Sequence, residues 1–430
     1  MAFSYSSIGE KLSRHSGIVE LMDDLGQALS EAQAGSTPVA MMGGGAPAHI
    51  PAVQEAWRRR LAEIVAEPAQ CDRMLTTYDP PLGNARFRES VARSLSDLCG
   101  WRLAAENVAV TCGGQSAFFY LFNLLAGDAP GGPRRVLLPI MPEYIGYADQ
   151  GLMEEMFVGL RPRIEMTGPH GFKYHVDFEA VDRALRDRAL GIAAICVSRP
   201  TNPSGNVLSD AELDGLASRA RQQGIPLIVD NAYGLPFPGA VFEPIAPLWD
   251  PNVILTFSLS KVGLPGVRTG FIVAEPEIIR RIGSLTGIIG LANTNVGQAI
   301  VRPMLDSSEL LQLSRDVICP YYRDKARLAE SLVREAFGDS FPFALHRSEG
   351  AFFLWLWLPE LPIATRELYR RLKARGVLIV PGEYFFYGLP AAEPWPHAAQ
   401  CLRLTFSQPA EVIERGVAAM AEELRRLHGR

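Results

Sequence analysis

The chain has 430 residues, a formal net charge of −5 at pH 7 and a hydrophobic content of 48%. This length exceeds one hydrophobic core and predicts at least two domains. A mildly acidic chain without a long basic run is a poor partner for nucleic acid or an acidic membrane surface, so we expect it to bind neither. The most apolar run, residues 351–358, is far too short to cross a bilayer.

The number and spacing of the cysteines indicate the cellular compartment. Six cysteines are scattered along the chain without C-x-x-C spacing, which argues against a zinc site and a disulfide framework. The N-terminal residues lack the basic and then apolar pattern of a secretion signal. We therefore expect a soluble protein of the reducing cytoplasm that binds no metal.

Strand and helix patterns divide the chain into three parts. Residues 1–47 form an N-terminal segment that we expect to pack on a smaller domain and to place Gly44 beside a substrate. Residues 48–305 alternate strand and helix, which predicts a large domain with a mostly parallel sheet between helices. A long helical stretch and several short strands in residues 306–430 predict a smaller α+β domain. The predicted fold class is α/β.

A glycine-rich helix start follows the first predicted strand, residues 108–111. The free N–H groups and partial positive charge of a helix start favour a phosphate. Gly114, Gln115 and Ser116 are therefore candidate phosphate ligands. The spacing differs from the G-x-G-x-x-G fingerprint of dinucleotide-binding proteins, and the chain has no G-x-x-x-x-G-K-[ST] run, so nicotinamide and ATP are weak candidates.

Two polar turns follow later strands. Tyr144 comes after strand 136–138 and either stacks on an aromatic ligand or belongs to the core. Strand 194–197 leads into a turn in which Asn202 precedes Pro203 and is restricted to extended conformations. The Asn202 amide can point at a ring oxygen and a substrate carboxylate. A purely structural turn explains the prolines equally well.

Residues 225–230 form an apolar strand that ends in Asp230. An aspartate at the carboxyl end of a buried parallel strand points into the crevice where α/β folds bind ligands. There Asp230 can keep a pyridinium nitrogen protonated. Tyr233 can donate its hydroxyl to a phenolic oxygen of the same ligand. Alternatively, Asp230 caps the next helix and Tyr233 only packs.

Residues 258–261 read Ser-Leu-Ser-Lys, and Arg268 follows in a glycine-rich turn. A lysine amine condenses with an aldehyde when it loses its proton more easily than a free lysine, whose pKa is about 10.4. A nearby phosphate requires hydroxyl donors and an arginine that grips it with two hydrogen bonds. Lys261 with Ser258 and Arg268 therefore indicates pyridoxal 5′-phosphate. By itself, this short match is also explained by a strand that ends at the surface.

Arg403 is the one charged residue of an alternating strand, residues 401–406. A buried cation is costly without an anionic partner, and the α-carboxylate of an amino acid is such a partner. Alternation alone leaves open whether Arg403 faces solvent instead.

Taken in this order, the motifs resemble the class I/II aminotransferases, over nearly the whole chain. The resemblance implies the fold of pyridoxal-phosphate-dependent transferases of fold type I. It also implies a role for each matching residue. Lys261 attaches the cofactor covalently and is catalytic, and Asp230 pairs with the ring nitrogen. Tyr233 and Asn202 contact the phenolic oxygen, Ser258 and Arg268 bind the phosphate, and Arg403 binds the substrate carboxylate.

Longer sequence segments make the resemblance more specific within the family. They are similar to bacterial members of the family that transfer the amino group of valine to pyruvate, and they comprise residues 14–18, 43–47, 114–123, 142–147 and 230–234. Residues 291–295 lie roughly where members that use dicarboxylates carry an arginine, and they contain none. The resemblance therefore implies substrates with small or apolar side chains and a place in amino-acid biosynthesis.

The family builds its site at a dimer interface, so the resemblance also implies a homodimer. Tyr78 is then a candidate phosphate ligand supplied by the partner subunit. The Asp-Pro-Pro-Leu-Gly turn that begins at residue 79 is explained by turn chemistry alone.

The expected reaction moves an amino group between L-valine- or L-alanine-type amino acids and 2-oxo acids in two half-reactions. Two alternatives remain. The motifs hold the cofactor without fixing which bond breaks, so a decarboxylase or lyase of the same fold is one. The other is a non-enzymatic pyridoxal-sensing module. It is less favoured, because the first motif begins too early to leave room for a DNA-binding domain.

Overall fold

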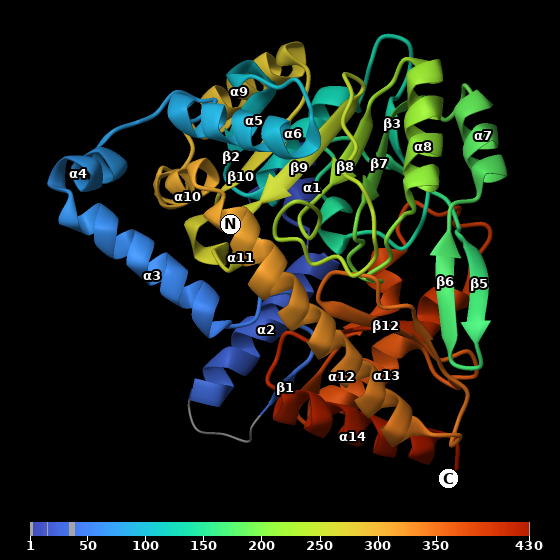
Figure 1. Ribbon diagram of the computed structural model, residues 1–430. Coiled ribbons are helices and arrows are strands. Elements are labelled where there is room, and N and C mark those ends of the chain that lie inside the picture. Colours follow the sequence, from blue (N-terminus) through green and yellow to red (C-terminus); the bar gives the residue numbers. More distant parts are fainter. Residues whose placement is uncertain (1–2, 15, 34–38, 430) are drawn as a thin grey trace.

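The computed structural model describes residues 3–14, 16–33 and 39–429. Its main sheet occupies the upper half of Figure 1, and most of the C-terminal elements lie below it. The main sheet has seven strands in the order β2 (Val108–Thr111), β10 (Gly270–Val273), β9 (Val253–Ser258), β8 (Leu227–Asp230), β7 (Ile192–Ser198), β3 (Arg135–Leu138) and β4 (Phe157–Gly159). Only β10 is antiparallel to its neighbours.

Helices alternate with these strands along the chain. Strands of a parallel sheet that helices cover are buried, and they therefore read as continuous apolar runs. The helices are α5 (Ala85–Cys99), α6 (Gly114–Leu125), α7 (Phe178–Arg186), α8 (Asp210–Gln223), α9 (Pro276–Ile289) and α10 (Val296–Asp306). Local sequence sets their ends. Ser209 and Glu212 form a capping box at the start of α8, and Gly224 ends it with a left-handed φ of 64°.

The carboxyl ends of three parallel strands bring polar residues into register. Ser198 of β7 lies opposite Asp230 of β8, and Asp230 lies opposite Thr256 of β9. Ser258 ends β9, and the chain turns there into a short 3₁₀ segment, Leu259–Val262. One edge of the sheet therefore collects the residues that the sequence singled out.

A second sheet has six strands in the order β14 (Val380–Pro381), β15 (Cys401–Thr405), β12 (Phe353–Trp357), β11 (Ala344–His346), β6 (Gly171–His175) and β5 (Arg163–Gly168). The β5–β6 hairpin comes from the range predicted for the large domain. It extends the C-terminal sheet instead, because β6 pairs in parallel with β11 and buries Phe172 and Tyr174 beside it.

The predicted helical stretch after residue 306 forms α11 (Glu309–Leu313), a π-helical turn (Ser314–Ile318) and α12 (Cys319–Phe337). Two more helices follow, α13 (Thr365–Ala374), which packs against β14 of the second sheet, and α14 (Ala410–Leu427), which packs against α12. Earlier in the chain, α3 (Pro51–Ala66) and α4 (Pro68–Thr76) project to one side in Figure 1.

The N-terminal segment contacts the C-terminal part of the chain. It contains α1 (Ser7–Leu12), α2 (Gly17–Gln33) and β1 (Ala40–Met41), and β1 pairs in parallel with β13 (Val377–Leu378). Glu20 and Asp24 of α2 accept hydrogen bonds from Tyr384 and Tyr369, respectively. Residues 1–2, 15 and 34–38 of this predicted segment lie outside the described residues.

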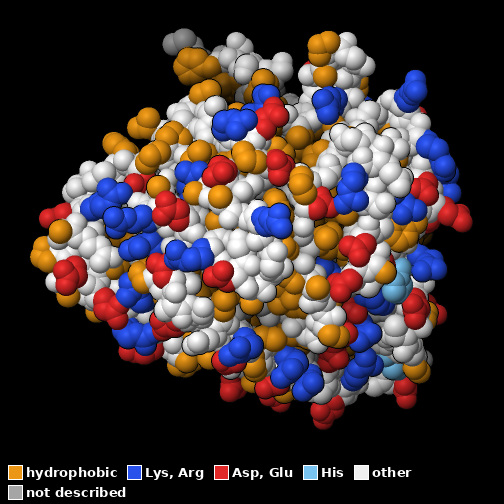
Figure 2. All heavy atoms as spheres, turned by 45° about the horizontal axis from the view of Figure 1, so that its top comes forward, with side chains coloured by type: hydrophobic (Ala, Val, Ile, Leu, Met, Phe, Trp, Pro, Cys, Tyr) orange, Lys and Arg blue, Asp and Glu red, His pale blue; other side chains and the backbone are white. Residues whose placement is uncertain are grey.

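On the face shown in Figure 2, Lys and Arg side chains are interspersed with Asp and Glu. Across the described parts of the chain, no helix is both long and apolar enough to cross a membrane. The same residues contain no cluster of His, Cys, Asp and Glu that could hold a metal ion.

Candidate active site

A cavity of about 390 Å³ lies at the carboxyl ends of β7, β8 and β9 and is also lined by α2 and by Arg403 of β15. It brings together most of the predicted site residues: Gly44, Gly114, Gln115, Tyr144, Asn202, Asp230, Tyr233, Ser258, Lys261, Arg268 and Arg403. Ser116 is not among the lining residues, since its hydroxyl turns back to the Cys112 carbonyl. Tyr78 lies outside as well and is 80% exposed after α4.

Lys261 is held inside the cavity by the 3₁₀ turn that follows β9. Its Nζ donates to the Gly45 carbonyl at 2.7 Å and lies 5.3 Å from the centroid of the Tyr233 ring. Burial lowers the pKa of Lys261 to about 8, and the charges of Arg403 and Arg268 act in the same direction. A neutral amine is therefore accessible near neutral pH, as a nucleophile or a general base requires.

Asp230 is buried at the end of β8 and accepts hydrogen bonds on both oxygens. Tyr147 donates to Oδ2 at 2.5 Å, and the Ala232 amide donates to Oδ1 at 2.8 Å. Burial raises the pKa of Asp230, whereas these hydrogen bonds and the Lys261 charge oppose the rise. The sequence analysis did not identify Tyr147 as a site residue, because its partner Asp230 lies 83 residues away in the chain.

One end of the cavity is suited to an anion. Gly113 precedes α6 with a φ of 82°, and a Cβ on it would lie 2.4 Å from Nη2 of Arg268. Only glycine therefore allows the arginine to approach the helix start. Arg268 makes only long hydrogen bonds, at 3.3 to 3.5 Å, to Pro265, Cys112 and Ser260. A phosphate here would meet a guanidinium, helix N–H groups and two serine hydroxyls.

Ser260 is the second of these hydroxyls, and it too lines the cavity. Hydroxyls flank Lys261 in the sequence, yet only Ser258 is a predicted phosphate ligand there. Gln115 lines the cavity, yet its amide nitrogen donates away from it, to the Gly146 carbonyl at 2.9 Å. The ring of Tyr144 is fixed by close packing, since a Cβ on Gly146 would lie 2.3 Å from it.

Arg403 is a buried cation, 2% exposed, at the opposite side of the cavity. Its Nη1 donates to Asn202 Oδ1 and its Nη2 to the Gly43 carbonyl, each at 2.7 Å, while its buried Nε has no hydrogen-bond partner. Burial lowers the pKa of Arg403 to about 10, so it stays charged at neutral pH. No carboxylate pairs with it among the described residues, which suits an anionic ligand.

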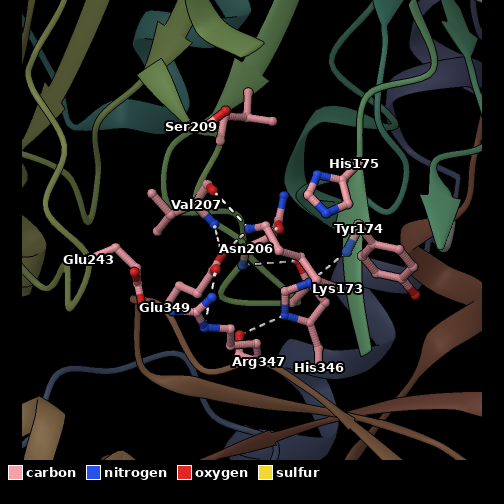
Figure 3. A network of polar contacts seen from close by, with 12 residues as sticks. Lys173, Tyr174, His175, Asn206, Val207, Ser209, Glu243, His346, Arg347 and Glu349 are labelled. Atoms are coloured by element: carbon pink, nitrogen blue, oxygen red, sulfur yellow. Dashed lines mark hydrogen bonds and ion pairs between the residues drawn. The ribbon is translucent and has the colours of Figure 1, made fainter. Parts of the chain in front are cut away.

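The loop that carries Asn202 is braced by an ion pair from the second sheet. Lys173 of β6 contacts the buried carboxylate of Glu349 and also donates to Asn206 Oδ1 and the Val207 carbonyl. The Val207 amide donates to the same Glu349 carboxylate at 2.9 Å. Figure 3 shows these groups converging. The β5–β6 hairpin thus helps to position the turn that holds Asn202.

The wall near α2 is apolar and is formed by Ile18, Leu21, Met22, Ile145 and Leu378. Asp24 also lines this part of the cavity, and its carboxylate accepts hydrogen bonds from Tyr369 and from Lys373. Residues 291–295 do not line the cavity of this chain. Asn293 and Asn295 instead donate to backbone carbonyls at Val110 and Thr77.

The cations that line the cavity, among the described residues, are Lys261, Arg268 and Arg403. Together with Asp230 they form a donor set that fits pyridoxal 5′-phosphate. Arg268 and the serines suit its phosphate, Asp230 suits its ring nitrogen, and Lys261 suits its aldehyde. Arg403 is left for a substrate carboxylate.

Comparison with known proteins agrees with this site. Residues 47–420 match the aminotransferase class I and II family. A valine–pyruvate aminotransferase of Escherichia coli K12 is 47% identical over 425 residues, 98% of each chain.

Solved structures agree as well. A putative amino-acid aminotransferase of Psychrobacter arcticum 273-4 matches with a TM-score of 0.95 and 40% identity over the whole of both chains. The valine-pyruvate aminotransferase of Salmonella typhimurium LT2 matches with a TM-score of 0.86 and 45% identity, over 96% of this chain and 100% of that one. The predicted family and fold class are therefore confirmed. The chain belongs to the class I and II aminotransferases and is a transaminase that uses pyridoxal 5′-phosphate.

Proposed function

We propose that the protein transfers the amino group of L-valine to pyruvate, producing 3-methyl-2-oxobutanoate and L-alanine. The observation that carries this proposal is the buried guanidinium of Arg403 without an acidic partner, in a cavity whose α2 wall is apolar. Arg403 suits the α-carboxylate, and the apolar wall suits a branched aliphatic side chain. Two relatives, from Escherichia coli K12 and Salmonella typhimurium LT2, are valine–pyruvate aminotransferases by name.

The charges in the cavity support this substrate class. A dicarboxylic amino acid would need a cation for its second carboxylate, in addition to Arg403. The remaining lining cations, Lys261 and Arg268, are required for the cofactor. Asp24, the acidic residue on the α2 wall, is itself paired with Lys373, so the described part of this wall supplies no unpaired lining cation for a second carboxylate.

Each residue of the chain then has a definite task. When bound, pyridoxal 5′-phosphate supplies a carbon that accepts the amino group and a ring that takes up the charge left by the α-proton. Lys261, with its lowered pKa, removes that proton from the substrate and returns it in the second part of the half-reaction. Asp230 stays ionised and holds a proton on the ring nitrogen. Arg403 orients the α-carboxylate so that the α-proton faces Lys261.

We also propose a homodimer in which Tyr78 of each chain reaches the phosphate end of the other chain's cavity. Large apolar side chains are exposed around Tyr78, namely Leu75 (66%) on α4, Ile288 (84%) at the end of α9 and Leu291 (61%) just after it. The Asn295 amide donates to the Thr77 carbonyl at 2.6 Å, which brings these two segments together. A second copy of the chain would bury this surface.

Mixing two inactive variants tests this arrangement. Tyr78→Ala and Lys261→Ala proteins are unfolded together, refolded, and assayed. If Tyr78 acts across the dimer, each mixed dimer contains one intact site, and about a quarter of wild-type activity returns because half of the dimers are mixed. No recovery by dimers of demonstrated mixed composition would contradict a shared site.

We place the protein in the cytoplasm. All six cysteines are free thiols, and intracellular reductants maintain that state. Cell fractionation with a periplasmic marker enzyme would test this assignment.

The main experiment follows the absorption of the bound cofactor. Adding L-valine to the purified enzyme should convert its visible band to that of the amine form. Pyruvate should then restore the band while L-alanine appears in stoichiometric amount. L-Aspartate in place of L-valine should react far more slowly. A band that L-valine leaves unchanged, with no alanine formed, would overturn the proposed reaction.

A further inference from the structure

A second buried carboxyl group, Glu143, lies behind Asp230. Glu143 is 0% exposed and is contacted only by neutral donors in its immediate surroundings. The Ser198 amide donates to Oε1 at 2.9 Å, and the Tyr144 amide donates to Oε2 at 3.2 Å. The reaction described above gives Glu143 no task, although burying a carboxyl group is costly.

Glu143 and Asp230 are the two ends of one hydrogen-bonded chain. Glu143 Oε2 lies 2.6 Å from Ser198 Oγ, and Ser198 Oγ lies 3.3 Å from the Tyr147 hydroxyl. The Tyr147 hydroxyl lies 2.5 Å from Asp230 Oδ2. Three oxygen–oxygen contacts therefore join the two carboxyl groups through Ser198 and Tyr147.

If all three contacts are hydrogen bonds, counting the available hydrogens gives the direction of this chain. An ionised Asp230 can only accept, so Tyr147 donates its single O–H to Asp230. The Tyr147 oxygen can then accept from Ser198 across the longer 3.3 Å contact, which would use the single O–H of that serine. At the remaining contact, only a protonated Glu143 can supply a hydrogen. If Glu143 were ionised as well, Ser198 would donate to it across the 2.6 Å contact, and the 3.3 Å contact between Ser198 and Tyr147 would have no hydrogen.

We propose that Glu143 is a neutral carboxylic acid in the working enzyme and a positioning residue for Asp230. Its O–H donates to Ser198, Ser198 donates to Tyr147, and Tyr147 donates to Asp230. These hydrogen bonds keep Asp230 ionised and oriented toward the ring nitrogen. The inference rests on the role of Asp230 in the proposed function.

The electrostatic surroundings support a neutral Glu143. Burial raises the pKa of Glu143 to about 8, and the charge of Asp230 acts in the same direction. The titratable groups that face it are Asp230, Tyr147, Tyr387 and Cys196, and none of these is a cation. Two carboxylates in one buried network would repel each other, so one of them retains its proton.

Infrared difference spectroscopy tests the protonation state directly, without turnover. The cofactor-free wild-type enzyme at neutral pH should show the carbonyl band of a protonated carboxylic acid, and Glu143→Gln should lack it. Glu349→Gln is the matched control. Glu349 is equally buried but paired with Lys173, so its replacement should leave the band in place. If the band is absent from the wild type, or survives in Glu143→Gln, the proposal is wrong.

The positioning role is read from the bound cofactor. Tyr147→Phe and Glu143→Leu should shift the pH midpoint of its absorption and lower kcat for L-valine about tenfold or more, with a smaller effect on KM. Glu143→Gln keeps a neutral donor toward Ser198, so it should shift the midpoint less than Glu143→Leu. Equal shifts in these two variants would refute the role.

The outcomes separate this inference from the proposed reaction. An enzyme that transaminates L-valine but lacks the infrared band retains the proposed reaction and loses the role of Glu143. An enzyme with the band but no reaction with L-valine loses the proposed substrate instead. Should Glu143→Leu fail to fold, the infrared comparison of Glu143→Gln with Glu349→Gln decides alone.

Discussion

Replacing Arg403 with leucine should remove recognition of the substrate carboxylate. The guanidinium donates to Asn202 and Gly43 while its Nε has no partner, so it can present two charge-assisted hydrogen bonds to a carboxylate after a small rearrangement. Each such bond contributes about 1.5 to 3 kcal/mol. Losing both amounts to about 3 to 6 kcal/mol, which predicts a decrease of about 10² to 10⁴ in kcat/KM for L-valine.

A substrate pair isolates this effect. Isobutylamine is valine without its carboxylate, so the ratio of the two substrates' half-reaction rates reports the carboxylate contact alone. We expect Arg403→Leu to lower the rate with L-valine steeply and the rate with isobutylamine little. Rapid-mixing absorption measurements give both rates in the same preparation.

Stability must be controlled as well, because the substitution leaves two buried acceptors without a donor. Arg88→Leu serves as the control variant, since Arg88 also donates to two acceptors, the backbone carbonyls of Val108 and Ala105, but lies outside the cavity. Arg88→Leu should lower the melting temperature without altering the ratio of the rates with L-valine and isobutylamine. An Arg403→Leu enzyme in which both substrates slow equally would refute the reasoning.

Three further substitutions probe other parts of the structure. Lys261→Met should abolish release of 2-oxo acid, measured by chromatography. It should also stabilise the cofactor-free enzyme at pH 7 by up to about 3 kcal/mol, because the folded pKa of about 8 lies below the ordinary 10.5 and folding therefore buries an unfavourable charge. Urea titrations should show this difference shrinking as the pH rises from about 8 to 10.5, and a constant difference would exclude the pKa shift as its cause. Lys173→Met should cost up to about 3 to 5 kcal/mol, because it removes the closer of the two cations beside the buried Glu349 and leaves Arg347, whose Nε lies 3.7 Å from that carboxylate. Adding Glu349→Gln should recover part of the loss. Urea titrations that show no such recovery would mean that the pair does not brace the loop. Asp24→Asn should raise the rate with L-glutamate severalfold relative to L-valine in competition assays, and an unchanged ratio would remove Asp24 from substrate selection.

The sequence predicted the parts of the site that follow local rules. Asp230 and Ser258 end buried strands, and Lys261 follows a strand directly, so their common location could be expected from parallel sheet geometry. Glu143 and Tyr147 were missed as a pair because their partners, Ser198 and Asp230, lie 55 and 83 residues away in the chain. Such pairing depends on tertiary contacts that no local pattern encodes.

The domain division illustrates the same limit. Residues 163–175 fall in the range 48–305, whose alternation of strands and helices predicted the large domain. Their pairing with β11 depends on a partner strand much later in the chain. The role of Tyr78 stays a prediction, because it concerns a second copy of the chain.

The position of the β5–β6 hairpin in the chain delays its pairing with β11 during synthesis. Strand β6 begins at Gly171, and its partner β11 begins at Ala344, roughly 170 residues later. At ribosomal rates of about 5 to 20 residues per second, β6 waits about 10 to 35 s with an unpaired edge that carries Phe172 and Tyr174. An open edge with aromatic side chains is prone to wrong pairing. The nascent hairpin is therefore a segment of this chain that benefits from shielding until its C-terminal partner strand is synthesised.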